Sequence, residues 1–251
     1  MKTAAIAVGA LAFGGLGAAR SARVAIVAPT TCEQITTLEV GDTYIASAER
    51  VTRGTFKPTG STDSVTTLPP FCRVTGVIRP TPDSHIAFEV WLPLENWNGK
   101  FAGVGNGGWA GIISYPALGD QLRRGYATVS TNTGHADEPN LDMAKFAFDH
   151  PERLVDFAWR SVHEMTTKGK LITQAFYGRS PRYAYWIGCS TGGKQGLMEA
   201  QRFPSDYDGI VAVAPANNWT PLLATAAYDT QALTLDPASF IQRKVMTSCA
   251  S

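Results

Sequence analysis

The stretch Tyr183-Ala-Tyr-Trp-Ile-Gly188-Cys189-Ser190-Thr191-Gly192-Gly193-Lys-Gln-Gly196-Leu197 decides the fold of this chain. In it an apolar, aromatic run meets Gly-Cys-Ser-Thr-Gly, and a segment compatible with a helix follows. The order strand, G-x-S-x-G, helix is typical of a nucleophile elbow, a sharp turn that pushes a serine hydroxyl out above a sheet. Gly188 and Gly192 flank the serine because side chains there would collide across the turn. The pattern predicts Ser190 as a nucleophile.

The length and composition are those of an ordinary globular protein. The chain has 251 residues, 44% hydrophobic and 17% charged, so it is long enough for one large domain, or for one and part of another. Its 22 basic and 21 acidic residues leave a net charge of +1. This balance gives no reason to expect nucleic acid or a membrane surface as a partner.

The N-terminus has the character of a targeting segment. Lys2 is followed by a run of small and apolar residues from Ala4 to Ala19, which Arg20 ends. The run is too short and too rich in glycine for a stable membrane span, so we expect a secretory signal peptide at residues 1–22, with cleavage between Ala19 and Ala28. A disordered or anchoring N-terminus is the alternative. A signal peptide implies an extracellular or periplasmic protein whose catalytic region occupies residues 23–251.

Export to an oxidising compartment makes the four cysteines disulfide candidates first. Cys32 and Cys72 lie in the same region before the elbow and are the natural pair. Cys189 and Cys249 either pair with each other or each lack a partner. No C-x-x-C and no cluster of histidine and cysteine is present, so the sequence predicts no metal site.

Strands and helices alternate from Lys100 onward, which predicts an α/β fold with a mostly parallel central sheet; together with the elbow this indicates an α/β-hydrolase. Ser47–Thr55 is expected to be an edge strand, and the period of two in Ile86–Leu92 indicates a strand with one buried face. Gly209–Ala214 is a continuous apolar run, which favours a central parallel strand covered on both faces. The other expected strands are 71–78, 100–104, 126–130 and 183–189. The expected helices are 115–124, 195–203 and a long helix over 151–177 with a break near Gly169. The apolar stripe of the long helix is predicted to face the core; it consists of Leu154, Val155, Ala158, Trp159, Val162 and Met165.

A glycine-rich loop, Gly105-Asn-Gly-Gly-Trp-Ala-Gly111, follows the strand at 100–104. It lacks both the G-x-x-x-x-G-K-[ST] and the G-x-G-x-x-G spacing, so it does not fit a phosphate-binding loop. A plain turn would not need this much glycine. The loop fits an oxyanion hole, because backbone N–H groups reach a substrate oxygen only where side chains do not intrude.

Several motifs together resemble the tannase and feruloyl esterase family. The most specific is Gly188-Cys-Ser-Thr-Gly-Gly193, and the resemblance runs from about Cys32 to the end of the chain. It implies an α/β-hydrolase that hydrolyses gallate, ferulate or related aromatic esters, with a small or plant-polymer-linked ester as substrate. The other matching segments are Gly105–Gly111, Phe176-Tyr-Gly178, Arg202–Ala216, Leu68-Pro-Pro-Phe-Cys-Arg73 and Asn218-Trp219.

The resemblance also implies roles for individual residues. Ser190 is expected to form the acyl-enzyme, and the backbone N–H groups of Gly108 and Thr191 to form the oxyanion hole. In the family, the cysteine at the position of Cys189 is bonded to a cysteine that follows the catalytic histidine, so its partner is absent from this chain. Cys249 resembles the first cysteine of an inserted lid, and its partner is expected to be absent too. That lid carries calcium in many members, whereas no cofactor is expected in the present chain.

The sequence departs from the family after the elbow. An α/β-hydrolase supplies Ser, then an acid, then His, but no histidine follows Ser190. His135 is the one histidine expected at the catalytic edge, with a structural or substrate-side role, and none is assigned as catalytic. We therefore expect the N-terminal part of a longer esterase, inactive by itself and ending where the lid begins. The alternative is a truncated, inactive remnant or a binding module. The other histidines are His85, in a turn, His150, at a helix start, and His163, on the polar face of a helix.

Overall fold

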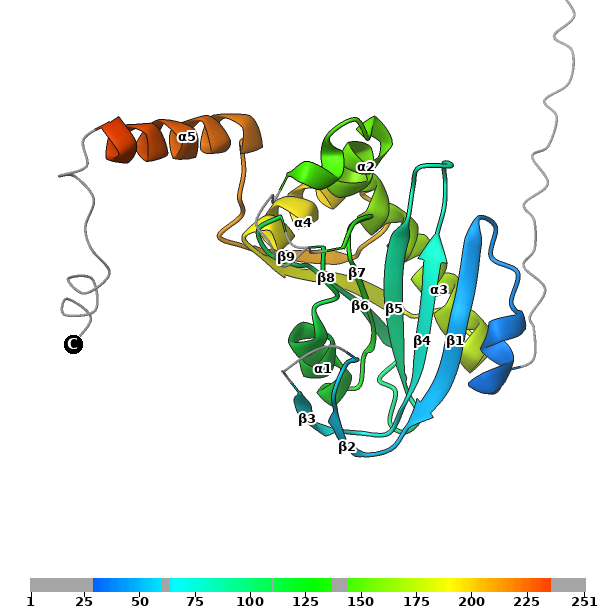
Figure 1. Ribbon diagram of the computed structural model, residues 1–251. Coiled ribbons are helices and arrows are strands. Elements are labelled where there is room, and N and C mark those ends of the chain that lie inside the picture. The colour runs from blue at the N-terminus through cyan, green and yellow to red at the C-terminus, as the bar shows by residue number, and fades with distance from the viewer. Residues whose placement is uncertain (1–28, 60–63, 110, 137–143, 236–251) are drawn as a thin grey trace, which may run out of the picture.

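A computed structural model describes residues 29–59, 64–109, 111–136 and 144–235 of the chain, and its main feature is a seven-stranded sheet (Figure 1). The predicted signal peptide at residues 1–22 and Cys249 lie outside the described residues. The order of the strands is β1-β4-β5-β7-β6-β8-β9, and a separate hairpin pairs β2 with β3. The strands are β1 (Thr43–Val51), β2 (Gly54–Phe56), β3 (Val65–Leu68), β4 (Phe71–Ile78), β5 (Ile86–Pro93), β6 (Lys100–Val104), β7 (Ala127–Thr131), β8 (Tyr183–Cys189) and β9 (Gly209–Val213).

Most strands of the sheet run in one direction. β6 is parallel to β7 and β8, and β8 is parallel to β9. β5 is antiparallel to both β7 and β4, and β1 is antiparallel to β4, so only β1 and β5 oppose the rest. The parallel part carries the elbow, because helices connect its strands and bring their carboxyl ends to one edge. The predicted α/β-hydrolase fold is confirmed.

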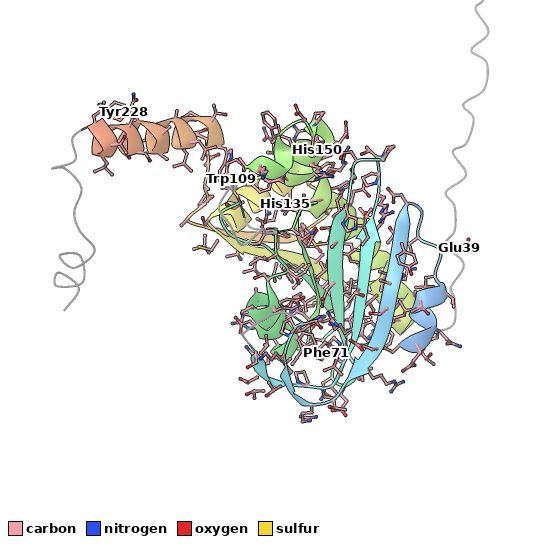
Figure 2. All side chains as sticks on the ribbon, in the orientation of Figure 1. Glu39, Phe71, Trp109, His135, His150 and Tyr228 are labelled. Carbon is pink, nitrogen blue, oxygen red and sulfur yellow. A yellow bond between two sulfur atoms is a disulfide. The ribbon has the colours of Figure 1, made fainter. Side chains whose placement is uncertain are left out.

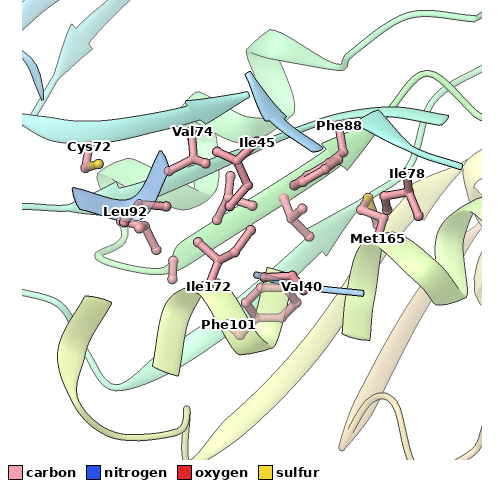
Figure 3. Close-up of a cluster of buried hydrophobic side chains, with 14 of the residues drawn as sticks. Val40, Ile45, Cys72, Val74, Ile78, Phe88, Leu92, Phe101, Met165 and Ile172 are labelled. Carbon is pink, nitrogen blue, oxygen red and sulfur yellow. The ribbon is translucent and has the colours of Figure 1, made fainter. Parts of the chain in front are cut away.

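Helices cover both faces of the sheet. On one face α3 packs over a core that includes Phe101, Met165 and Ile172 (Figure 3). On the other, α1 and the β2–β3 hairpin cover a second core built around Trp91. The helices are α1 (Tyr115–Arg123), α2 (Pro151–Val155), α3 (Ser161–Tyr177), α4 (Thr191–Arg202) and α5 (Trp219–Leu235), with 3-10 turns at Glu33–Thr37 and Lys145–Ala147.

The predicted break near Gly169 is wrong, and the irregularity lies earlier. Asp156–Arg160 forms a π-helical turn between α2 and α3. Gly169 is inside α3, where a Cβ would lie 3.1 Å from Cζ of Phe101, so its place reflects close packing rather than a break. The π turn shifts the faces of the helix, which explains why Leu154 is 49% exposed although it was predicted in the core stripe.

Strand β5 is buried on both faces, so the prediction of one buried face is wrong. The sequence pattern suggested Glu89 as a solvent-facing residue, yet Glu89 is only 5% exposed. Arg73 on β4 donates two hydrogen bonds to its carboxylate, at 2.9 and 2.5 Å, and Trp91 and Tyr115 donate one each. A carboxylate is tolerated in a core when it is paired and hydrogen-bonded in this way.

At the other end of the sheet, β9 is an edge strand in the described chain and not the covered central strand that its apolar run predicted. Its only neighbour in the sheet is β8, and Val211 and Val213 are 52% and 48% exposed. Beyond it, α5 has no buried residues and extends away from the sheet (Figure 1). None of the helices in the described part of the chain has the length and apolar character that a membrane span requires.

We expect the exposed β9 edge to make the 251-residue chain self-associate, because an apolar edge strand offers unpaired backbone groups to a second copy. Replacing Val211 and Val213 with lysine should shift the chain toward monomer in size-exclusion chromatography with light scattering. Replacing the exposed Tyr44 with lysine on β1, at the opposite edge, is the matched control. Equal association of the unmodified chain, the variant with lysine at Val211 and Val213, and the Tyr44→Lys variant would contradict the assignment of β9 as the edge that associates.

Candidate active site

Ser190 stands at the junction of β8 and α4 in a strained conformation. Its φ is 58° and its ψ is −117°, a region that a residue with a side chain occupies only when its surroundings enforce it. The strand ends at Cys189 and the helix begins at Thr191, four residues earlier than the predicted start at Gln195. Ser190 is exposed at the carboxyl end of the strand. This is the geometry of the predicted nucleophile elbow.

Backbone hydrogen bonds hold the elbow in place. The Ser190 N–H donates to the carbonyl of Val213 at the end of β9, and the Ser190 carbonyl accepts from the N–H of Ala216, both at 3.0 Å. The end of β9 and the segment that follows it are therefore hydrogen-bonded to the turn on both sides of Ser190. Such constraints stabilise a conformation that by itself costs about 1–3 kcal/mol.

The glycines of the elbow are required by close approaches of the backbone. A Cβ at Gly188 would lie 2.2 Å from the carbonyl oxygen of Gly192, and a Cβ at Gly105 would lie 2.5 Å from Cα of Gly192. A Cβ at Gly193 would lie 2.7 Å from the carbonyl oxygen of Val213. The glycine-rich loop thus packs directly against the elbow, backbone to backbone.

We expect Gly188→Ala to lower the free energy of unfolding by about 3 kcal/mol, because the clash is with backbone that cannot turn away. Gly107→Ala is the matched control: it lies in the adjacent loop and a Cβ there meets nothing within 4 Å. Urea denaturation of the two variants measures the difference. Similar midpoints for both would show that the elbow is looser than these distances indicate.

Side-chain hydrogen bonds join the glycine-rich loop to the elbow helix. Nε2 of Gln195 donates to Oδ1 of Asn106 at 2.8 Å. Oγ1 of Thr191 donates to the carbonyl of Gly108 at 2.8 Å. The two residues predicted to form the oxyanion hole are therefore brought together. Thr191 is also the first residue of α4, where N–H groups point along the axis out of the helix.

Aromatic rings gather beside this loop. Trp109, directly after Gly108, stacks on Phe157 with ring centroids 5.1 Å apart and meets Trp219 edge-on at 5.0 Å. The ring of His135 stacks on Phe146 at 3.7 Å. The π turn places Phe157 in this group. Figure 2 shows Trp109 and His135 on the same side of the molecule, above the ends of the parallel strands. We call these five residues the aromatic cluster.

Each of three histidines has a structural partner. Nε2 of His135 lies 2.6 Å from the carbonyl of Trp109, and since a carbonyl only accepts, this nitrogen carries the proton. His135 lies in the loop just after the carboxyl end of β7, the edge of the sheet at which it was predicted. His150 lies at the start of α2 with Nδ1 2.9 Å from Asp83, and Nδ1 of His163 lies 2.7 Å from Asp206. His163, predicted on the polar face of a helix, is partly buried and packs against the turn before β9.

The described residues test one of the two predictions on the cysteines. Cys32 and Cys72 form a disulfide with a Cα–Cα distance of 5.6 Å, which confirms the predicted pair. Cys189 is an exposed free thiol in the described chain. Because Cys249 lies outside the described residues, the alternatives for these last two cysteines remain predictions.

The sequence did not single out Lys194, one turn after Ser190. Its ammonium group lies 4.8 Å from the ring centre of Phe157 and 5.8 Å from that of Trp219, and it donates to the carbonyl of Ala158 at 3.1 Å. Burial lowers the pKa of Lys194 to about 8. The sequence placed Trp109 in the glycine-rich loop, close to the elbow. It gave no sign that Phe157 and Trp219 lie beside Lys194, because only the fold brings these two residues there.

Sequence comparisons agree with this geometry. The family model described as tannase and feruloyl esterase matches residues 72–248. An uncharacterized esterase of Xanthomonas campestris is 42% identical over 193 residues, covering 76% of this chain and 33% of the relative. Feruloyl esterase B of Aspergillus niger is 46% identical over 157 residues, covering 62% and 29%. The chain spans about a third of the length of these relatives.

Solved structures give the same result. The crystal structure of feruloyl esterase B from Aspergillus oryzae superposes with a TM-score of 0.69 at 34% identity, covering 75% of this chain and 37% of that one. A tannin acyl hydrolase from Aspergillus niger superposes with a TM-score of 0.58 at 26% identity, covering 78% and 36%. The elbow, the loop packed against it and these matches lead to one conclusion. The chain belongs to the tannase and feruloyl esterase family.

Proposed function

We propose that this protein is a serine esterase in which Ser190 attacks the ester carbonyl and forms an acyl-enzyme. The observation that carries the proposal is the strained, exposed Ser190 between β8 and α4. A serine held above the carboxyl end of a parallel sheet presents its hydroxyl to a substrate that approaches from outside the sheet. The Ser190 oxygen bonds to the carbonyl carbon as the carbonyl π bond breaks. Collapse of the tetrahedral intermediate then breaks the bond from this carbon to the alkoxy oxygen, which leaves as the alcohol with the proton that the serine hydroxyl gave up.

The oxyanion hole is the second part of the proposal. The N–H groups of Thr191 and Gly108 are assigned to it. The bond from Oγ1 of Thr191 to the carbonyl of Gly108 supports this assignment, because it fixes the loop and the helix end relative to each other. Thr191 also lies at the positive end of the α4 dipole, which favours a developing negative charge.

A fluorophosphonate probe tests the nucleophile directly. The protein expressed from its whole gene should be labelled at Ser190, located by peptide mass spectrometry, and the label should be lost after heat denaturation. A label on another serine would contradict the assignment. We expect the 251-residue chain alone to react far more slowly, because His135, His150 and His163 are engaged with Trp109, Asp83 and Asp206.

We further propose an ester of an aromatic acid as the substrate. The relatives include proteins named as feruloyl esterases and a tannin acyl hydrolase. In this chain the aromatic cluster stands next to the glycine-rich loop, where an aromatic ring of the substrate would stack on Trp109. Stacking of this kind contributes about 0.5–1.5 kcal/mol beyond the area buried.

Trp109→Ala should raise KM for methyl ferulate or methyl gallate by up to about tenfold and leave methyl butyrate nearly unchanged, because only the aromatic esters lose a stacking partner. The comparison of the two ester types in one variant separates stacking from general damage. Tyr228→Ala is the control, since this ring is 70% exposed on α5 (Figure 2). Equal losses for aromatic and aliphatic esters would count against an aromatic site at Trp109.

We propose that the protein works outside the cytoplasm. The apolar segment at residues 1–22 is the motive for this proposal, and the Cys32–Cys72 disulfide supports it, since such bonds persist in oxidising compartments. Detection of the mature protein in the culture medium or periplasm, with an N-terminus between Ala19 and Ala28, is the test.

A further inference from the structure

Three side chains with metal-binding groups meet on the face of the sheet that α3 and α4 cover. His163 comes from α3, Glu199 from α4 and Asp206 from the turn between α4 and β9. One nitrogen or oxygen of each lies within 4.8 Å of the others. Glu199 is more than two helical turns beyond Ser190, so this cluster is separate from the active site.

Glu199 distinguishes this cluster from a chance grouping of charges. Its side chain is 0% exposed, and neither carboxylate oxygen has a hydrogen-bond donor in the described chain. A buried carboxylate without a partner is strongly unfavourable, and proteins resolve the cost with a counter-ion, a proton or a metal. The carboxyl group of Glu199 is directed at Asp206, which is itself only 7% exposed.

His163 and Lys170 are the polar neighbours of the two carboxylates. Nδ1 of His163 lies 2.7 Å from Oδ2 of Asp206, and the imidazole is held flat against Phe203, with ring centroids 3.7 Å apart. The side chain of His163 is 26% exposed, which provides a path from solvent. The ammonium group of Lys170 donates to the backbone carbonyl of Asp206, and its charge also interacts with the carboxylates of Glu199 and Asp206, so a bound ion would share the cluster with this cation.

We propose that His163, Glu199 and Asp206 bind a divalent transition-metal ion, for which Zn²⁺ is the best match. One imidazole nitrogen and two carboxylate oxygens are ligands that Zn²⁺ accepts, whereas Ca²⁺ and Mg²⁺ favour oxygen-only sites. Ligand atoms around a tetrahedral ion lie about 3.4 Å apart, and the three candidate atoms here lie within 4.8 Å of one another. The ion would tie α3, α4 and the turn before β9 together.

The test is metal binding by the 251-residue chain, stripped with chelator and freed of any affinity tag. Equilibrium dialysis against Zn²⁺, followed by metal analysis, should give one ion per chain. Scanning fluorimetry should show Tm raised by about 5 °C at saturating Zn²⁺, with no comparable effect of Ca²⁺. Glu199→Gln should raise the Kd for Zn²⁺ at least about tenfold. This variant keeps the volume of Glu199 and its amide donates to Asp206, so we expect it to fold.

Two controls exclude other zinc ligands. His150→Gln removes a histidine that pairs with Asp83, and Cys189→Ser removes the exposed thiol, and both should bind Zn²⁺ as the unmodified chain does. Absence of a stoichiometric ion would overturn the proposal, because a proton alone would then serve the cluster. Binding that survives Glu199→Gln or that disappears with Cys189→Ser would also overturn it. These measurements need no esterase activity, so they stand apart from the proposed function.

Discussion

Ser190→Ala should reduce kcat for methyl ferulate or methyl gallate by about 10⁶-fold in the protein expressed from its whole gene, since loss of a serine nucleophile leaves only substrate binding and the oxyanion hole. The other hydroxyl at the elbow, that of Thr191, is bonded to the carbonyl of Gly108, and alanine at position 190 retains the Cβ and the backbone conformation. Initial rates and fluorophosphonate labelling, measured on the same preparation, check the result.

The control for this variant is Ser180→Ala, an exposed serine in the loop between α3 and β8, which should hydrolyse both esters at the unmodified rate. Ser190→Gly adds a second readout. Glycine relieves the positive φ of 58° and should raise the free energy of unfolding by about 1 kcal/mol while abolishing activity. Activity in Ser190→Ala above a tenth of the unmodified rate would rule out Ser190 as the nucleophile.

Local sequence patterns predicted the elements in which one physical signal dominates. The strand at 71–78 and the helix that ends before Gly125 are where pattern and turn residues placed them. The elbow is the strongest case, because G-x-S-x-G after a strand is compatible with few other structures. Gly188, Gly192 and Ser190 were predicted from chemistry alone, and the close approach of Gly192 to Gly105 explains why the glycines are needed.

The errors occur where distant parts of the chain decide the outcome. Glu89 is buried because Arg73 on the neighbouring strand neutralises it, and the alternation within β5 contains no sign of that partner. The apolar run of β9 is typical of a covered strand, but composition does not tell whether another element packs against it, and in the described chain Val211 and Val213 stay about half exposed. The cluster around Glu199 is assembled from three separate elements, and the aromatic cluster around Trp109 from five. Composition and spacing along one segment cannot report such contacts.

The disulfide between Cys32 and Cys72 is expected to contribute more to the free energy of unfolding than any other interaction considered above. Cys32 and Cys72 are 40 residues apart and both are fully buried. Closing a loop of this length restricts the unfolded chain, and the loop-entropy estimate is about 4 kcal/mol. In the folded state the bond fixes the 3-10 turn Glu33–Thr37 so that Ile35 fills the core beneath β1 and β4.

The double variant Cys32→Ala, Cys72→Ala should therefore lose about 4 kcal/mol of unfolding free energy in urea denaturation. Cys189→Ser, which removes the exposed thiol, should change the midpoint by less than about 0.5 kcal/mol. A reductant should lower the midpoint of the unmodified chain toward that of the double variant and leave the variant itself unchanged. If thiol titration shows the bond reduced and the midpoint does not move, the N-terminal segment is held by the packing of Ile35 and its neighbours rather than by the disulfide.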